Sequence, residues 1–241
     1  MCRRFDSRLG HHDLKYFRMA SLFLEPGDPA PRFALPAVNR DGEVSLDDYR
    51  GRSALLVGLF RGLHCPFCRR QLVQLDASRG KLKALGVETL AVVNTPLERA
   101  RLYFKHRPAQ VMLAADPEAA THRSYGLPAG EVVEDESKAA WPRRLTMSQL
   151  QAARINPTGE LPTPLNPFAA NDALNQREGF EPTEVDQKIA AAHGTQLAGY
   201  FLIERDGIIR WRFIEAAERI GDLAKFPSAE EILTAAGSLE G

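Results

Sequence analysis

The sequence predicts an α/β fold in which a central mixed β-sheet carries helices on both faces. Strand-like apolar runs alternate with segments of helical periodicity from residue 54 to residue 125, and such alternation produces neighbouring parallel strands joined by helices. After a long irregular segment, a hairpin signal and a final helical segment complete the chain. The hairpin adds antiparallel strands and makes the predicted sheet mixed.

The first elements are extended chain, a short hairpin and a buried strand. Three prolines within 27–36 favour extended chain over helix. The turn signal at 41–42 predicts a short hairpin, and the continuous apolar run 54–60 predicts a strand buried on both faces. Apolar residues at helical spacing then predict a helix from Cys68 that ends at Gly86.

The alternation of strands and helices continues along the next segments. Residues 88–93 and 111–114 are predicted strands, and 97–105 and 119–125 are predicted helices. Because the strands are joined by helices, we expect them to run parallel and to end at one edge of the sheet, where loops form active sites in such folds.

Residues 128–196 interrupt this order, with seven prolines separated by polar stretches. We interpret them as a long insertion with helical stretches at 147–154 and 184–192. The insertion could cover a site or form a homodimer contact. Its aromatic residues could anchor either arrangement or form a small core of their own; they are Trp141, Phe168 and Phe180.

Regular structure resumes after the insertion. Strands at 199–203 and 208–213 flank the turn signal at 205–207 and predict a hairpin. Ser228 is typical of the residue that caps a helix, and acidic residues follow in the first turn, where the helix dipole favours them. The last helix therefore begins after Ser228.

Composition and charge exclude several classes of protein. The 241 residues contain 31 Lys plus Arg and 31 Asp plus Glu, and 44% are hydrophobic, as in an ordinary globular protein. The balanced charge gives no support for a nucleic-acid partner.

No apolar run approaches the roughly 20 residues that span a bilayer. With no secretory signal visible, we expect no membrane association and a cytoplasmic location.

The expected organisation is one domain over 19–241 that includes the insertion. Residues 1–18 are polar, basic and aperiodic, so we interpret them as a disordered tail or as a start assigned too early. Cys2 and the pair at 11–12 lie in this tail and would form only a partial set of metal ligands.

The motif Cys65-Pro66-Phe67-Cys68 follows the buried strand and opens a helix. Pro66 suits the first helical position, which places Cys65 at the N-cap. There, backbone N–H groups and the helix dipole favour a thiolate, and such sites lower a cysteine pKa from about 8.5 to roughly 3.5–7.5. The spacing brings both sulfurs to one end of the helix. We therefore predict that Cys65 attacks and Cys68 resolves.

Several neighbours could tune or line this centre. Thr95 and Pro96 end a strand at the same sheet edge, where they could line the site or simply form a strand-to-helix turn. Positive potential could come from basic residues around the motif, which could equally be ordinary surface charges; they are Arg61, His64, Arg69 and Arg70.

Other interpretations of the cysteine pair are inert packing and metal binding. A metal site needs about four ligands, and a single CxxC motif supplies two. No second CxxC motif, GxGxxG motif or P-loop is present, and the histidines are scattered. We therefore expect no metal and no cofactor.

Five stretches carry a family resemblance, namely 27–36, 44–51, 60–72, 116–126 and 201–210. They resemble the alkyl hydroperoxide reductase C/thiol-specific antioxidant family, so the chain is similar to peroxiredoxins but has a CxxC centre. The resemblance covers 26–127 and 197–215. It implies a thioredoxin-like fold, a three-layer sandwich with the insertion before the last β-hairpin. It also implies an antioxidant thiol oxidoreductase with Cys65 at the reactive position.

The chain departs from the family pattern at three positions. The proline seven residues before the reactive cysteine and the threonine or serine three residues before it are Gly58 and Gly62 here, and the arginine before the late strand is Ala198. Two hydrogen-bonding groups of a peroxide pocket are thereby missing.

Two substrates therefore remain open, a peroxide and a protein or small-molecule disulfide. The family resemblance favours the peroxide, whereas the CxxC motif and the missing groups favour the disulfide. Recycling would need a dithiol donor of the thioredoxin or glutathione type. The alternative is a non-enzymatic binding module, or a redox sensor, that uses 128–196.

Overall fold

A five-stranded mixed sheet forms the centre of the molecule, in the order β5-β4-β3-β8-β9. The computed structural model describes residues 23–239, so the predictions for 1–18, Cys2 and the histidine pair lie outside the described residues. β3 runs parallel to β4 and antiparallel to β8, which confirms the mixed sheet. The strands are β3 (Ala54–Phe60), β4 (Val87–Val93), β5 (Met112–Ala115), β8 (Gly199–Ile203) and β9 (Ile209–Ile214).

The central strand β3 is buried along its whole length, as its continuous apolar run predicts. Successive side chains of a strand point to opposite faces. Leu55 and Val57 accordingly pack in one hydrophobic core, and Leu56 and Phe60 pack in the other. Burial on both faces holds the carboxyl end of β3, from which the cysteine motif follows, in a fixed position.

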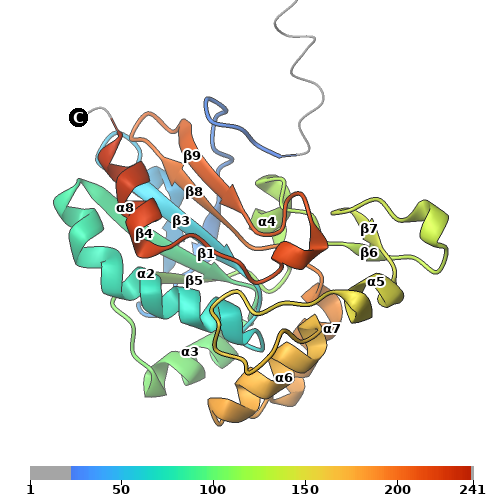
Figure 1. Cartoon of the computed structure of the whole chain (residues 1–241). Helices are drawn as coiled ribbons and strands as arrows, with labels where there is room; N and C mark the ends of the chain where they lie inside the picture. Colours follow the sequence, from blue (N-terminus) through green and yellow to red (C-terminus); the bar gives the residue numbers. More distant parts are fainter. Residues whose placement is uncertain (1–22, 240–241) are drawn as a thin grey trace, which may run out of the picture.

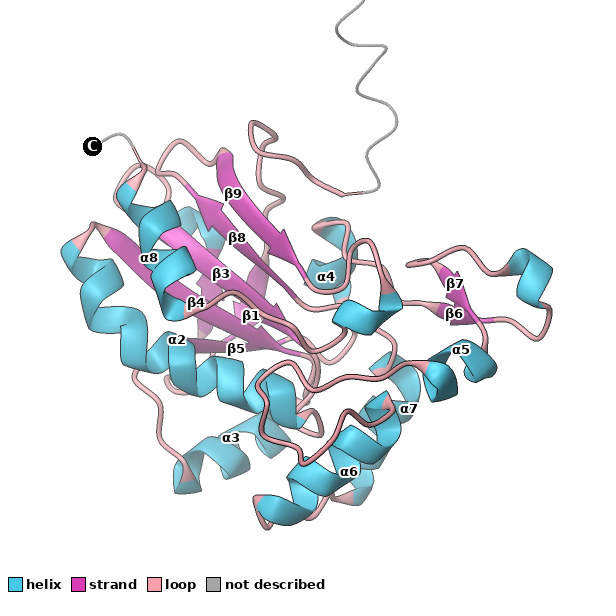
Figure 2. Cartoon of the chain, viewed as in Figure 1, coloured by secondary structure: helices cyan, strands magenta, loops and turns pink. Residues whose placement is uncertain are grey.

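Helices and a hairpin cover the two faces, which makes three layers (Figures 1 and 2). α2 (Pro66–Ala84), α3 (Leu97–His106) and α8 (Ala229–Gly237) contribute to the core on one face. The hairpin of β1 (Ala34–Pro36) and β2 (Glu43–Ser45) and the short α4 (Ala120–Ser124) lie against the other.

The predicted turns and cap are present. Gly42 and Gly207 have φ angles of 83° and 86° and form the tips of the two hairpins, in the left-handed region that favours glycine. The Ser228 side chain accepts a hydrogen bond from Glu231 N at the start of α8, and Glu231 accepts one in return from Ser228 N. These local signals therefore predict the element boundaries well.

The segment 128–196 contains more structure than its sequence predicts. Its elements are β6 (Glu131–Val132), η3 (Glu136–Lys138), β7 (Arg144–Leu145), α5 (Met147–Ala152), α6 (Pro167–Arg177) and α7 (Glu184–His193). α6 is not among the predicted helices, because its sequence begins at Pro167 within a proline-rich stretch. Instead Pro167 occupies the first turn and Asn166 caps the helix. In Figure 1 this segment lies beyond the arrowhead end of β3.

Candidate active site

The cysteine motif has the geometry that the sequence predicts. Cys65 is the N-cap of α2 with an extended backbone, and Pro66 occupies the first turn. The Cys68 N–H donates a hydrogen bond of 3.3 Å to Cys65 Sγ. The sulfur of Cys65 therefore takes the place of a capping oxygen, and the helix end stabilises negative charge on it.

The pKa values of the Cys65 and Cys68 thiols shift in opposite directions. Burial raises the pKa of Cys65, but hydrogen bonding from Cys68 and the charge of Arg61 outweigh it and lower the pKa to about 6. Burial, together with the neighbouring Cys65, raises the pKa of Cys68 above its ordinary value. Both cysteines are free. At neutral pH Cys65 is thus a thiolate beside a protonated thiol, the asymmetry that an attacking and a resolving cysteine require.

Arg61 supplies the positive charge beside the sulfur. It lies just after β3, is buried, and donates from Nη2 to Cys65 Sγ at 3.6 Å. Its other donors reach Glu215 Oε2 and Oε1 at 2.7 and 2.8 Å and Gln196 O at 3.0 Å. The rigid fork of the guanidinium lets it bind the carboxylate and the sulfur together.

Glu215 is a site residue that the sequence reasoning missed. It follows β9, is fully buried, and also accepts hydrogen bonds from Ala198 N at 3.1 Å and Ala224 N at 2.5 Å. Ala198 is the position at which the family has an arginine, so here a guanidinium lies beside the sulfur from a different place in the chain, Arg61 in the loop after β3. The sequence signal for Glu215 is weak, namely an acidic residue close after a predicted strand.

The other basic neighbours differ from Arg61 because Arg69 and Arg70 form their ion pairs with the insertion rather than contacting the Cys65 sulfur. Burial and the charge of Arg61 lower the pKa of His64 to about 4, so His64 is neutral at pH 7. Arg69 donates to Asn175 Oδ1 at 2.7 Å and pairs with Glu178. Arg70 pairs with Glu178 and Glu160. The two arginines therefore attach the start of α2 to the insertion.

Thr95 and Pro96 lie beside the loop that carries the motif. Thr95 Oγ1 accepts a hydrogen bond of 3.1 Å from Leu63 N, and Pro96 takes the N-cap position of α3. Neither residue lines the cavity next to Cys65. Their observed contacts fit a strand-to-helix turn that holds the loop between β3 and α2.

Close packing explains why glycine, with no Cβ, occupies positions 58 and 62, where the family has peroxide-pocket residues. A Cβ at Gly62 would lie 2.6 Å from Ile189 Cγ2 of α7 and 2.9 Å from Asn94 O. A Cβ at Gly58 would lie 2.7 Å from the Phe60 ring. The insertion thus fills the space that a threonine or serine would need at position 62.

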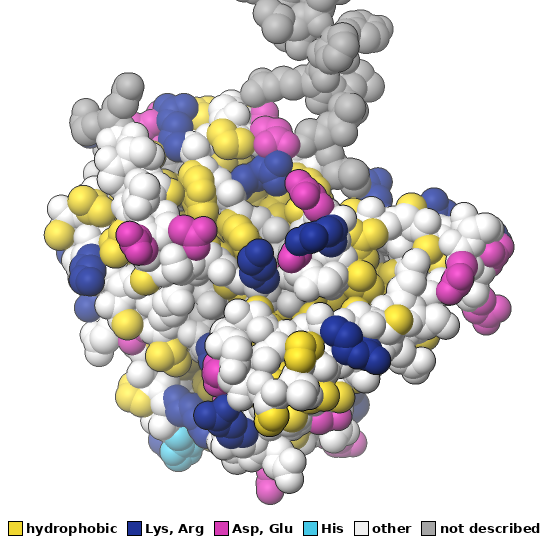
Figure 3. Space-filling view, viewed as in Figure 1, with side chains coloured by type: hydrophobic (Ala, Val, Ile, Leu, Met, Phe, Trp, Pro, Cys, Tyr) yellow, Lys and Arg dark blue, Asp and Glu magenta, His cyan; other side chains and the backbone are white. Residues whose placement is uncertain are grey.

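A cavity of about 420 Å³ lies over the motif, and Cys65 forms part of its wall although the residue is only 3% exposed. Arg61 and His64 also line it. Most of the wall comes from the insertion, including Val132, Trp141, Leu145, Leu150, Ile155 and Phe168. In Figure 3, yellow hydrophobic side chains gather between the segment before α8 and the β6–β7 arm, both of which are located in Figure 1. The sulfur is therefore reached through a small, mostly apolar space.

The predicted aromatic anchors divide between two environments. Trp141 lines the cavity and donates from Nε1 to Ala216 O at 2.6 Å, and Phe168 lines the cavity from α6. Phe180 is instead buried beneath the guanidinium of Arg69, whose Cζ lies 4.0 Å from the ring centroid, and it packs against Tyr103. The insertion therefore covers the site, and through Phe180 it packs against α2 and α3 rather than around a separate core of its own.

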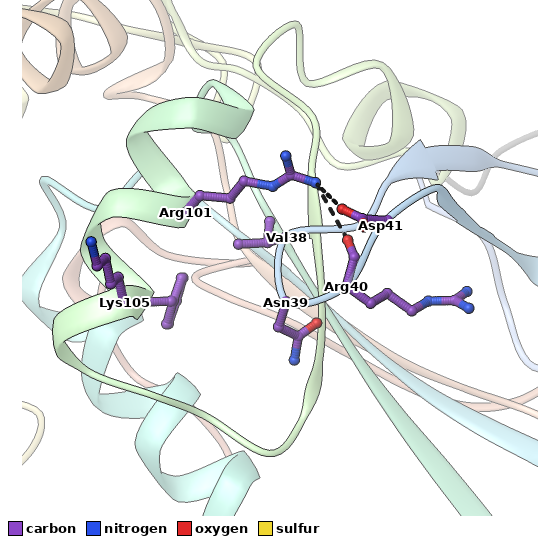
Figure 4. A pocket seen from close by; sticks show the side chains of 7 residues that line it. Val38, Asn39, Arg40, Asp41, Arg101 and Lys105 are labelled. Atoms are coloured by element: carbon purple, nitrogen blue, oxygen red, sulfur yellow. Dashed lines mark hydrogen bonds and ion pairs between the residues drawn. The ribbon is translucent and has the colours of Figure 1, made fainter.

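A second hollow of about 480 Å³ lies between the β1–β2 turn and α3 (Figure 4). Arg101 contacts Asp41 and the backbone oxygen of Arg40 there, and Lys105 lies alongside. None of the predicted site residues lines it. Its side chains serve the packing of the hairpin against α3.

The described part of the chain has neither a cluster of metal ligands nor a membrane-spanning helix. Residues 23–239 hold no group of three or more His, Cys, Asp or Glu side chains that could bind a metal ion. Over the same residues, no helix is both long and apolar enough to cross a bilayer.

A three-layer α/β sandwich with two cysteines at the start of a helix defines a thiol oxidoreductase of thioredoxin-like fold. The sequence model of the AhpC/TSA family matches residues 26–159. The chain belongs to this family, and the resemblance inferred from the sequence is confirmed. No curated protein matches the chain.

Solved structures confirm the fold. Peroxidoxin BcpB from Mycobacterium tuberculosis has a TM-score of 0.53 at 10% identity, over 90% of this chain and 99% of that one. The reduced 2-Cys peroxiredoxin of Plasmodium vivax has a TM-score of 0.53 at 17% identity, over 88% of this chain and 79% of that one. The mitochondrial 2-Cys peroxiredoxin of Plasmodium falciparum has a TM-score of 0.50 at 13% identity, over 89% of this chain and 93% of that one. Peroxiredoxins thus share the fold despite low identity.

Proposed function

We propose that this protein reduces small hydroperoxides with Cys65 as the attacking thiolate and Cys68 as the resolving thiol. The observation that carries the proposal is a low-pKa sulfur, 3% exposed, at the wall of a cavity of about 420 Å³. A small molecule fits such a space, whereas the disulfide of a folded protein would need the insertion to move. Membership of the AhpC/TSA family supports the same chemistry.

The reaction has three steps. The Cys65 thiolate attacks the terminal oxygen of R–O–OH, the O–O bond breaks, and the alkoxide leaves as an alcohol after taking a proton, so that Cys65 becomes a sulfenic acid. The Cys68 thiol then attacks that sulfur, forms the Cys65–Cys68 disulfide and releases water. A dithiol donor reduces the disulfide and is itself oxidised.

Arg61 has two roles in the first step. Its charge favours the thiolate before the attack. Because Nη2 lies beside the sulfur, it is also placed to donate to the oxygen on which negative charge develops as the O–O bond breaks. The Glu215 carboxylate keeps the guanidinium in this orientation.

The second candidate function is exchange with a small disulfide. The CxxC motif and the two glycines at positions 58 and 62 favour it, since the hydrogen-bonding groups of the family's peroxide pocket are replaced. The same cysteines would act in the same order, with a thiolate leaving in place of an alkoxide.

Stopped-flow mixing of the reduced protein separates these functions. The fluorescence of Trp141 can follow the reaction, because its ring lines the cavity beside Cys65. A rate constant with hydrogen peroxide or tert-butyl hydroperoxide well above that of free cysteine supports the peroxidase. A rate no faster than free cysteine overturns it, and fast reaction with hydroxyethyl disulfide then supports disulfide exchange.

Two further outcomes address the remaining alternatives. If neither reagent reacts and the thiolate titrates with an unshifted pKa, the chain is a binding module. If oxidation changes proteolysis within 128–196, the same chemistry serves a redox sensor. Cys65→Ser is the control and should abolish every fast phase.

A further inference from the structure

The insertion places apolar side chains from several of its elements around one small space. Trp141 and Leu145 come from the β6–β7 arm, Leu150 from α5 and Phe168 from α6. The cavity volume of about 420 Å³ lies within the roughly 300–1,000 Å³ of small-molecule sites. Binding of a ligand against an apolar wall is favourable mainly because it removes apolar surface of the ligand from water.

The charges around the cavity disfavour an anionic occupant. The charge of Arg61 is balanced by Glu215, and His64 is neutral at pH 7. The remaining ionisable groups on the described wall are the Cys65 thiolate and Asp172 of α6, and the negative charge of both disfavours an anionic ligand. The wall is therefore suited to a hydrocarbon group rather than to an anionic tail.

The wall is attached to the rest of the fold at several points. Arg69 of α2 holds Asn175 of α6 at 2.7 Å, and Arg99 of α3 holds Asp186 of α7 through a bidentate pair at 2.7–3.1 Å. The indole of Trp141 donates to Ala216 O. These contacts join the insertion to α2, to α3 and to the segment after β9. The cavity therefore keeps its shape over the sulfur.

We propose that the insertion forms a substrate-selecting subsite that binds an uncharged hydrocarbon group, with Met147, Leu150 and Phe168 as specificity-determining residues. This inference rests on the proposed function for the identity of the reacting bond, since the group bound in the cavity would be the R group of the hydroperoxide. Selectivity for the R group would then come from the insertion, residues 128–196, rather than from the residues around the cysteine motif.

A homologous series of N-alkylmaleimides, from methyl to hexyl, tests the subsite without relying on peroxide chemistry. Peptide mass spectrometry counts modification at Cys65 alone. The rate constant should rise with chain length, by up to about fourfold per methylene group that is fully buried. Free cysteine provides the baseline, which should show no such gradient.

Two exposed wall residues permit substitutions with little risk to folding. Phe168 and Met147 are 47% and 43% exposed, so Phe168→Gln with Met147→Gln should fold and should flatten the gradient. The matched control is Leu102→Gln with Val73→Gln, which changes exposed apolar residues outside the cavity. It should keep the full gradient.

The outcomes distinguish the subsite from the proposed function. A flat series in the wild-type protein, or an equal gradient in the cavity variant, overturns the subsite. If Cys65 reacts with hydrogen peroxide but with no maleimide, the subsite is wrong and the proposed function stands. A gradient that depends on Phe168 and Met147 without any peroxide reaction supports the subsite and overturns the peroxidase.

Discussion

Arg61 and Glu215 form a buried, bidentate ion pair with N–O distances of 2.7 and 2.8 Å, and the same guanidinium contacts the sulfur of Cys65. The Glu215 carboxylate also accepts backbone hydrogen bonds from Ala198 and Ala224. Four donors thus satisfy a charge that is fully buried. The pair joins the end of β3 to the segments before β8 and after β9, so it contributes to both stability and reactivity.

Glu215→Gln should destabilise the fold by about 3–5 kcal/mol, because it removes the carboxylate that pairs with the buried charge of Arg61. Urea unfolding at constant pH measures the free energy of unfolding. Arg219→Gln is the control: Arg219 pairs with Asp222 and is 73% exposed, so its loss should change stability by less than about 1 kcal/mol. Equal effects of the two substitutions would contradict a structural role for the buried pair.

Arg61→Gln should raise the pKa of Cys65 from about 6, by about 1–3 units, because a neighbouring positive charge is lost. The thiolate is the reactive form, so the wild-type rate should increase through pH 6 and level off above it. The profile of the variant should be displaced to higher pH. Ultraviolet absorbance of the thiolate gives the pKa, and Arg61→Lys should recover part of the shift. An unchanged profile in both variants would exclude Arg61 from the activation.

Cys68→Ser should retain the first oxidation step and block the second. Intact-mass spectrometry after one equivalent of hydroperoxide should show a gain of one oxygen atom, as expected for a sulfenic acid on Cys65. The wild-type protein should instead lose two hydrogen atoms as the disulfide forms. A disulfide in the variant, or none in the wild type, would mean that Cys68 is not the resolving thiol.

Acid should destabilise the protein through two buried histidines. Burial lowers the pKa of His64 to about 4 and that of His122 to about 3, from an ordinary 6.5. Between these values and 6.5 the unfolded chain binds more protons than the folded chain, so stability falls as pH falls through this window. The slope should approach about 2.7 kcal/mol per pH unit for two protons. Urea unfolding at pH 7 and pH 5 tests this. His122→Leu should reduce the slope by about half.

The strands, the first helix and the cysteine geometry could be predicted because their signals are local. The apolar run 54–60 gives β3, and Pro66 after Cys65 sets the start of α2. By contrast, α6 lacks a clear apolar stripe and begins at a proline. Packing against α2 and the contact between Asn175 and Arg69 determine which side of α6 is buried. The periodicity of the α6 sequence does not indicate these contacts.

By itself, the sequence determined the α/β order of elements and the N-cap thiolate, because hydrogen bonding within one helical turn and burial along one strand depend on neighbouring residues. Only the tertiary structure decided which acid holds Arg61, since Glu215 lies 154 residues away along the chain. It also decided that Ile189 occupies the space beside Gly62 and that the insertion encloses the sulfur. These contacts form when distant segments pack together, and a local sequence pattern carries no information about that packing.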